Sequence, residues 1–154
     1  MSETTVKLTR GSLSLEGILG LPAQALGIVV FAHGSGSGRF SPRNNFVARK
    51  LQQGRVATLL IDLLTPDEAE DRSKVFDIDL LADRVLWSKD WLEQDGRTKG
   101  LALGYFGAST GAGAALAPDP RPNIVLITTD DQTIQDMSWL PKTRAALATA
   151  GVTF

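Results

Sequence analysis

The chain has 154 residues, of which 21% are charged and 43% hydrophobic, a balance typical of one folded domain rather than of a disordered chain. Its formal net charge of -1 gives no electrostatic footprint for nucleic acid, and the absence of cysteine excludes disulfides, thiolate zinc sites and cysteine nucleophiles. The first residues have no apolar signal-peptide core, and no apolar run is long enough to cross a membrane. We therefore expect a cytoplasmic protein without nucleic-acid or membrane partners.

The first residues predict a β-hairpin. Residues 4–10 and residues 12–19 both alternate polar and apolar side chains, and Gly11 lies between them. Alternation with a period of two is typical of antiparallel strands that have one face on a core and the other in water. Pro22 then ends the second strand, because proline cannot donate a hydrogen bond to a sheet.

Three continuous apolar runs predict a parallel sheet. They are residues 27–32, residues 56–61 and residues 101–106. A run without polar alternation suits a strand that is buried on both faces. The runs alternate with helical segments, and this order implies parallel strands with right-handed crossovers.

The segment after the first run predicts one helix, and the segment after the second run predicts a surface loop. Residues 45–53 carry Phe46, Val47 and Leu51 at helical spacing, and a glycine follows them as a stop signal. Residues 63–74 are acidic and polar around a proline, which favours a loop.

Residues 76–93 predict a longer helix that covers the sheet. Leu81, Val85 and Leu92 recur there with a helical period. Together these elements predict an α/β fold: a mostly parallel sheet with helices on both faces and an N-terminal antiparallel hairpin.

Two glycine-rich turns follow predicted strands. Residues 33–38 (His-Gly-Ser-Gly-Ser-Gly) form a donor-rich loop at the carboxyl end of the first parallel strand, where open α/β sheets bind ligands. Residues 107–111 (Gly-Ala-Ser-Thr-Gly) lie between the last strand and a run of small residues. A G-x-S-x-G turn between a strand and a helix lifts its serine hydroxyl, here that of Ser109, to the top of a parallel sheet. The alternative reading of this turn is that its glycines serve only the packing of strand against helix.

Several of these motifs, in this order, resemble the small dienelactone-hydrolase-like α/β-hydrolases. The resemblance covers about residues 1–117 and rests on residues 30–37, 60–66, 76–78, 90–92 and 107–111. It implies a hydrolase that acts on a small-molecule ester or lactone with Ser109 as nucleophile. It also implies an oxyanion hole made by the Thr110 amide and an amide of the loop that holds Gly34 and Ser35.

The same resemblance predicts impaired catalysis. In these hydrolases a histidine that follows the nucleophile in the chain takes the serine proton. The only histidine here is His33, which precedes Ser109 and matches the strand-end position of the family rather than its catalytic base. We expect His33 to be a hydrogen-bonded structural residue that braces the loop.

The last part of the chain departs from the hydrolase pattern. Residues 121–132 resemble the first strand of the sulfatase family, and the likeness continues to residue 154. It implies a partial calcium site at Asp130 and Asp131, which is only a fragment because calcium takes about six to eight oxygen ligands. The chain therefore divides into residues 1–117, the N-terminal half of a truncated α/β-hydrolase domain, and residues 118–154, a sulfatase-like strand and helix.

The two parts leave several interpretations open. The join is a natural fusion, a truncated reading frame or an assembly artefact, and residues 123–129 are expected to add a strand to the hydrolase sheet. A sulfatase-type sulfuric ester hydrolase is one alternative function, although the nucleophile motif of that family is absent. Apart from weak calcium, no cofactor is expected. A non-enzymatic interaction module that associates with itself through an open sheet edge is another alternative.

Overall fold

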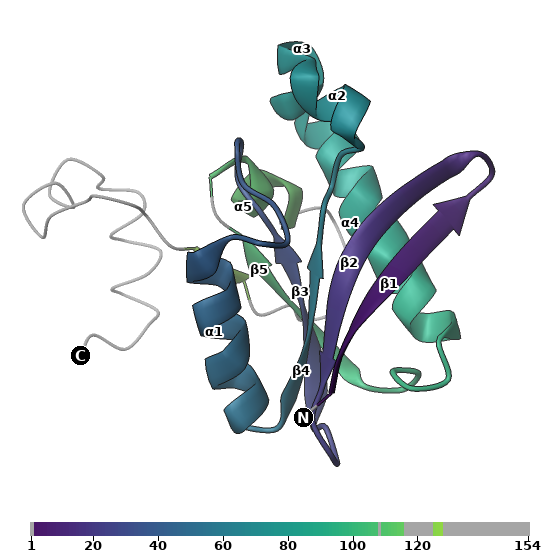
Figure 1. Cartoon of the computed structure of the whole chain (residues 1–154), viewed down its shortest axis with the longest axis vertical. Coiled ribbons are helices and arrows are strands. Elements are labelled where there is room, and N and C mark those ends of the chain that lie inside the picture. Colours follow the sequence, from purple (N-terminus) through teal and green to yellow (C-terminus); the bar gives the residue numbers. More distant parts are fainter. Residues whose placement is uncertain (1, 108, 116–124, 128–154) are drawn as a thin grey trace, which may run out of the picture.

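The computed structural model describes residues 2–107, 109–115 and 125–127, and these form a mixed sheet flanked by helices (Figure 1). The strand order of the sheet is β1-β2-β4-β3-β5-β6. Strands β3 to β6 are parallel to one another, whereas β2 pairs antiparallel with both β1 and β4. The strand bounds are β1 (Ser2–Arg10), β2 (Leu13–Leu21), β3 (Gly27–Ala32), β4 (Val56–Ile61), β5 (Ala102–Gly107) and β6 (Val125–Ile127).

The strands confirm the expected architecture. The N-terminal hairpin is β1 and β2, and the three apolar runs are β3, β4 and β5, each within one residue of its predicted bounds. The expected additional strand is present at residues 125–127, where β6 pairs parallel with β5 from Tyr105↔Val125 to Gly107↔Ile127. The helix expected after this strand, within residues 118–154, lies outside the described residues.

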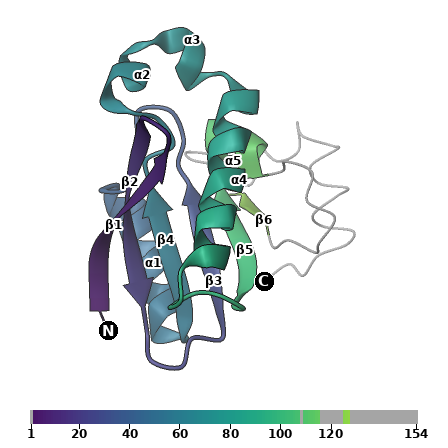
Figure 2. The same cartoon turned by 90° about the vertical axis from the view of Figure 1, so that its right-hand side faces the viewer.

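Helices cover both faces of the sheet, as predicted. Helix α1 (Pro42–Gln53) lies on one face, and α4 (Ile78–Gln94) and α5 (Thr110–Ala115) lie together on the other (Figures 1 and 2). The core under α1 is small and centres on the tilted ring pair of Phe31 and Phe106. The core under α4 and α5 is larger, and it includes Leu81, Val85 and Leu92, the predicted apolar stripe of α4.

Helix α1 begins earlier than predicted, and its apolar residues are buried unequally. The helix begins at Pro42 rather than at residue 45, and its buried residues are Asn44, Ala48 and Gln52. Of the three apolar residues noted at helical spacing, Val47 and Leu51 are partly buried against the core, whereas Phe46 is 58% exposed. The small side chain of Ala48 lets the helix approach the sheet closely, and a phenylalanine on that face would hold it away.

A polar contact fixes the inner face of α1 against the sheet. The Gln52 amide donates a hydrogen bond to the Thr58 hydroxyl at 2.8 Å, and both side chains are buried. Gly20 makes room for this pair, since a Cβ there would lie 1.9 Å from Gln52 Nε2. This buried hydrogen bond is a contact that hydrophobic periodicity does not register.

The predicted surface loop at residues 63–74 contains two short helices. They are α2 (Pro66–Glu70) and α3 (Arg72–Val75), which rise above the carboxyl ends of the strands (Figure 1). Thr65 and Glu68 form a capping box, in which each side chain accepts a hydrogen bond from the backbone of the other. That pattern, with Pro66 at the first helical position, was a helix signal that the polar composition concealed.

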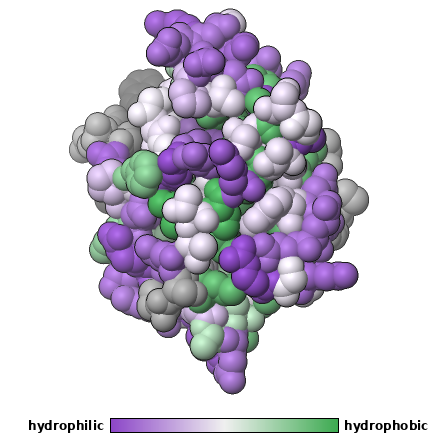
Figure 3. Space-filling model, turned by 45° about the vertical axis from the view of Figure 1, so that its right-hand side comes forward, coloured by the Kyte–Doolittle hydropathy of each residue, from purple (hydrophilic) through white to green (hydrophobic). Residues whose placement is uncertain are grey.

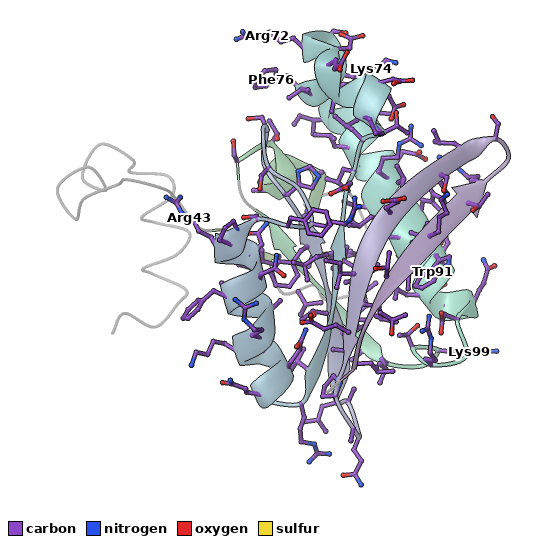
Figure 4. The ribbon with its side chains drawn as sticks, viewed as in Figure 1. Arg43, Arg72, Lys74, Phe76, Trp91 and Lys99 are labelled. Carbon is purple, nitrogen blue, oxygen red and sulfur yellow. The ribbon has the colours of Figure 1, made fainter. Side chains whose placement is uncertain are left out.

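The outer end of this helical pair is polar and solvated. Figure 4 shows Arg72, Lys74 and Phe76 at the tip of the molecule, where the Arg72 guanidinium lies 5.6 Å from the centre of the Phe76 ring. The Asp71 carboxylate caps α3, and the hydrogen bonds that Ser73 donates to it lower the pKa of Asp71. Among the described residues, no helix is both long and apolar enough to cross a membrane.

The inner face of α1 makes a direct prediction about stability. Phe46→Ala should change the free energy of unfolding by less than about 0.5 kcal/mol, because Phe46 faces solvent. Ala48→Leu should destabilise the fold by about 1–3 kcal/mol, because the added side chain has no space against the sheet. Urea denaturation of both variants measures the difference, and a larger cost for Phe46→Ala would contradict this packing.

Candidate functional site

The sheet has a topological switch point between β3 and β5. The chain leaves β3 through α1 towards β4 on one side, and it leaves β5 through α5 towards β6 on the other. The two strands are parallel neighbours in a register that pairs Ala32 with Gly107, so they end at the same level. In open α/β sheets, ligands bind in the crevice at such a point. The two glycine-rich turns predicted from sequence both begin there.

Ser109 has a backbone conformation that few non-glycine residues adopt. It is the second residue after the end of β5, with φ of 53°, and it is exposed. The Ala112 N–H donates a hydrogen bond of 3.0 Å to the Ser109 carbonyl, which closes the turn as α5 begins. Non-glycine residues with positive φ are strained, and such strained residues cluster at functional sites. The sharp turn predicted from the G-x-S-x-G pattern is present.

Close backbone packing explains the glycines of this turn. A Cβ on Gly111 would lie 2.0 Å from the Ala32 carbonyl oxygen and 2.5 Å from that of His33. A Cβ on Gly107 would lie 2.7 Å from Ala112 Cα. No backbone contact of that kind accommodates a side chain. Gly111 therefore allows the turn to lie directly against the end of β3, and Gly107 allows α5 to fold back closely over the end of β5.

His33 braces the loop that follows β3, as expected. Its Nε2 accepts a hydrogen bond from the Leu63 N–H at 3.0 Å. Since an accepting nitrogen carries no proton, Nδ1 holds the hydrogen of the neutral ring, and it donates to the Gly34 carbonyl at 3.0 Å. Both ring nitrogens are therefore engaged with the backbone.

The predicted oxyanion residues line one cavity. Its volume is about 670 Å³, and Gly34, Ser35 and Thr110 all contribute to its wall. Ser109 precedes Thr110 in the turn at its margin. Apolar side chains form another part of the wall, namely Leu15, Leu64, Pro66, Ala69, Val75 and Leu81. On the face of the molecule that Figure 3 shows, polar residues predominate and apolar residues lie between them in small patches.

Sequence reasoning missed a charged cluster beside this cavity. Arg39, at the end of the glycine-rich loop, forms ion pairs with Asp62 and Glu16, and all three line the cavity. A signal for Asp62 was available, because it directly follows β4 at the same sheet edge as the loop. Nothing in the sequence spacing pairs Arg39 with Glu16, which lies on the hairpin.

The predicted calcium ligands lie outside the described residues. This holds for both Asp130 and Asp131, so the structure offers no geometry for them. Within the described residues, no group of three or more histidine, cysteine, aspartate or glutamate side chains is placed to hold a metal ion.

Comparison with solved structures places the chain among α/β-hydrolase folds. A dienelactone hydrolase from Anabaena variabilis is 54% identical, with a TM-score of 0.71 over 75% of this chain and 55% of its own. An α/β-hydrolase from a Penicillium species is 17% identical, with a TM-score of 0.69 over 97% of this chain and 55% of its own. The esterase Est1E from Butyrivibrio proteoclasticus is 16% identical, with a TM-score of 0.58 over 70% of this chain and 42% of its own.

The curated relatives have a different name. A Mycobacterium tuberculosis protein, in each of two strains, is 51% identical over 126 residues, which are 80% of this chain and 28% of the relative. Its name is "Putative phosphoribosyl transferase". No family model matches the chain.

These comparisons establish the fold of the chain and show how much of each relative it covers. The α/β fold with its N-terminal antiparallel strand pair is that of the α/β-hydrolase neighbours. The chain spans about half the length of the dienelactone hydrolase and about a quarter of the M. tuberculosis relatives. None of the relatives described above is a sulfatase.

The contact between the turn and β3 predicts that one added methyl group at Gly111 lowers the stability of the fold. Gly111→Ala should destabilise the protein by about 1–3 kcal/mol or more, because its Cβ meets backbone that cannot move aside. Gly96→Ala is the control, since nothing lies within 4 Å of a Cβ there, and it should stay within about 0.5 kcal/mol of wild type. Thermal or urea denaturation compares them, and equal stabilities would refute the close approach.

Proposed function

We propose that this chain carries the nucleophile and the oxyanion-binding loop of a serine-dependent hydrolase that acts on ester or lactone bonds. The observation that supports this most strongly is the positive φ of Ser109 between a parallel strand and a helix, beside the switch point. Such a strained strand-to-helix turn is the nucleophile elbow of α/β-hydrolases. The 54% identity with a dienelactone hydrolase supports the same activity.

In the proposed reaction, Ser109 Oγ attacks the carbonyl carbon of the substrate. The tetrahedral intermediate then expels the alcohol group, and the acyl group stays on Oγ until water hydrolyses it. The negative charge on the former carbonyl oxygen needs preorganised N–H donors. The Thr110 N–H and an N–H of Gly34 or Ser35 are the proposed donors, since these residues share one cavity wall.

The reaction also needs a base, and this chain alone is proposed to lack one. A serine hydroxyl is a weak nucleophile until an adjacent group takes its proton. The sequence holds one histidine, and both nitrogens of the His33 ring already bond to backbone groups. We therefore propose that the chain by itself hydrolyses esters slowly.

The name of the M. tuberculosis relatives is compatible with a hydrolase activity of this chain. A transferase activity of those proteins need not reside in the 28% of their length that this chain matches. The same part of this chain matches a dienelactone hydrolase over 55% of that enzyme. This chain covers a larger share of the dienelactone hydrolase than of the M. tuberculosis relatives. The geometry around Ser109 also suits a hydrolase.

Added imidazole tests the nucleophile and the missing base together. Hydrolysis of p-nitrophenyl acetate is measured for wild type and Ser109→Ala, with and without imidazole, and the difference between the two proteins is the Ser109-dependent rate. A general base contributes about 10²–10⁴-fold, so imidazole should raise this difference about tenfold or more. Subtraction of the Ser109→Ala rate removes the reaction of imidazole itself with the ester.

The controls separate the two parts of the proposal. Ser73→Ala removes another exposed hydroxyl, far from the turn in sequence, and should behave as wild type. Equal rates for wild type and Ser109→Ala with imidazole present would disprove the nucleophile. A high Ser109-dependent rate without imidazole would instead disprove the missing base.

A further inference from the structure

The loop after β3 is rich in glycine, so ordering it costs conformational entropy. Three of the five residues from Gly34 to Gly38 are glycine, and Gly36 has φ of 70°. Glycine loses more conformational entropy on ordering than any other residue. The backbone bonds at its two ends are those donated by Ser37 N–H to Gly34 at 3.2 Å and by Ser41 N–H to Gly38 at 3.0 Å. Side chains must therefore supply the constraint.

The first constraint acts at the start of the loop. His33 bonds at once to the Gly34 carbonyl and to the Leu63 N–H, each at 3.0 Å. This holds the first loop residue against the chain that leaves β4.

The second constraint acts at the end of the loop and is ionic. The Arg39 N–H donates to Asp62 Oδ1 at 2.7 Å, and the Arg39 guanidinium donates to the other oxygen of the same carboxylate. The opposite side of the guanidinium donates to Glu16 on β2. Only 17% of the Arg39 side chain is exposed. A planar guanidinium presents its donors in a fixed fork, so it holds two carboxylates in a more defined geometry than an ammonium does.

The carboxylate of Asp62 sits directly beneath the loop backbone. A Cβ on Gly38 would lie 2.9 Å from Asp62 Oδ1, so glycine at that position permits the contact. The Asp62 N–H in turn donates to the Glu16 carbonyl at 3.0 Å, which ties the aspartate to the hairpin. Asp62 and Leu63 are consecutive, so both ends of the loop are fixed to one short segment after β4.

We propose that Arg39 is a positioning residue, which Asp62 and Glu16 hold in place so that the Gly34–Gly38 loop keeps its N–H groups facing the cavity. This inference rests on the proposed function, since it assigns those N–H groups to transition-state stabilisation. This cluster of Arg39, Asp62 and Glu16, here called the clamp, is proposed to act through the loop backbone to which Arg39 is joined. Its loss should lower kcat with little effect on KM, because a displacement of about 1 Å can cost about 100-fold in rate.

The test measures both the loop and the turnover in Asp62→Asn. The asparagine keeps an oxygen for the Arg39 N–H but loses the charge that holds the guanidinium. Amide hydrogen exchange in a peptide spanning residues 33–41 should become at least about tenfold faster. The kcat of the Ser109-dependent, imidazole-assisted hydrolysis should fall by about 10–100-fold, with KM within about twofold of wild type. Arg39→Lys should shift both quantities in the same direction, because a shorter, non-planar ammonium loses the fixed fork of donors that pairs with both carboxylates.

Asp83→Asn provides a matched control. Asp83 pairs through both carboxylate oxygens with Arg10, which connects β1 to α4 away from the loop. This variant loses an arginine–aspartate pair and should leave exchange at residues 33–41 and kcat unchanged. The midpoint of thermal unfolding, measured for all variants, shows that each still folds.

The outcomes distinguish this inference from the proposed function. Unchanged exchange at residues 33–41 in Asp62→Asn would overturn the clamp, whatever the turnover. Faster exchange with unchanged kcat, or equal effects of Asp83→Asn, would overturn the positioning role. Absence of any Ser109-dependent turnover in wild type would overturn the proposed function, and with it the catalytic purpose of the clamp, while the exchange data decide the clamp itself.

Discussion

The contact between the turn after β5 and the end of β3 is the constraint on which the site depends. Gly111 lies so close to the carbonyls of Ala32 and His33 that no side chain fits between them. This contact sets the serine-bearing turn beside the loop after β3 and places Thr110 on the same cavity wall as Gly34. The parallel register of β3 and β5 brings the two strand ends to the same level. The missing side chain of Gly111 then lets the turn approach the end of β3.

Around this contact, the described residues provide rigidity rather than proton transfer. The imidazole of His33 acts as donor at one nitrogen and acceptor at the other, so it stabilises the loop and has no free position for a serine proton. The Arg39 guanidinium is likewise engaged, through ion pairs with Asp62 and Glu16. The charged and titratable groups nearest the loop are thus occupied in holding it, which suits a scaffold for a nucleophile better than a complete catalytic centre.

Most of the fold was predictable because burial leaves a direct pattern in the sequence. Continuous apolar runs located the parallel strands, and the glycines around Ser109 located the turn, since both reflect local requirements. The apolar spacing of α1 located Val47 and Leu51 against the core but did not show that Ala48 is buried while the larger Phe46 is exposed. The pair of Arg39 and Asp62 is 23 residues apart and exists only because β3 and β4 are neighbours, so sequence spacing could not reveal it.

Labelling by a serine-directed fluorophosphonate tests most directly the central claim, a poised serine without a base. We expect slow labelling that mass spectrometry maps to Ser109, that accelerates when imidazole is added and that is absent in Ser109→Ala. Such a result would mean that the turn presents a competent hydroxyl and that proton removal limits its reaction. Rapid labelling of Ser109 without imidazole, or labelling at other residues only, would contradict the account.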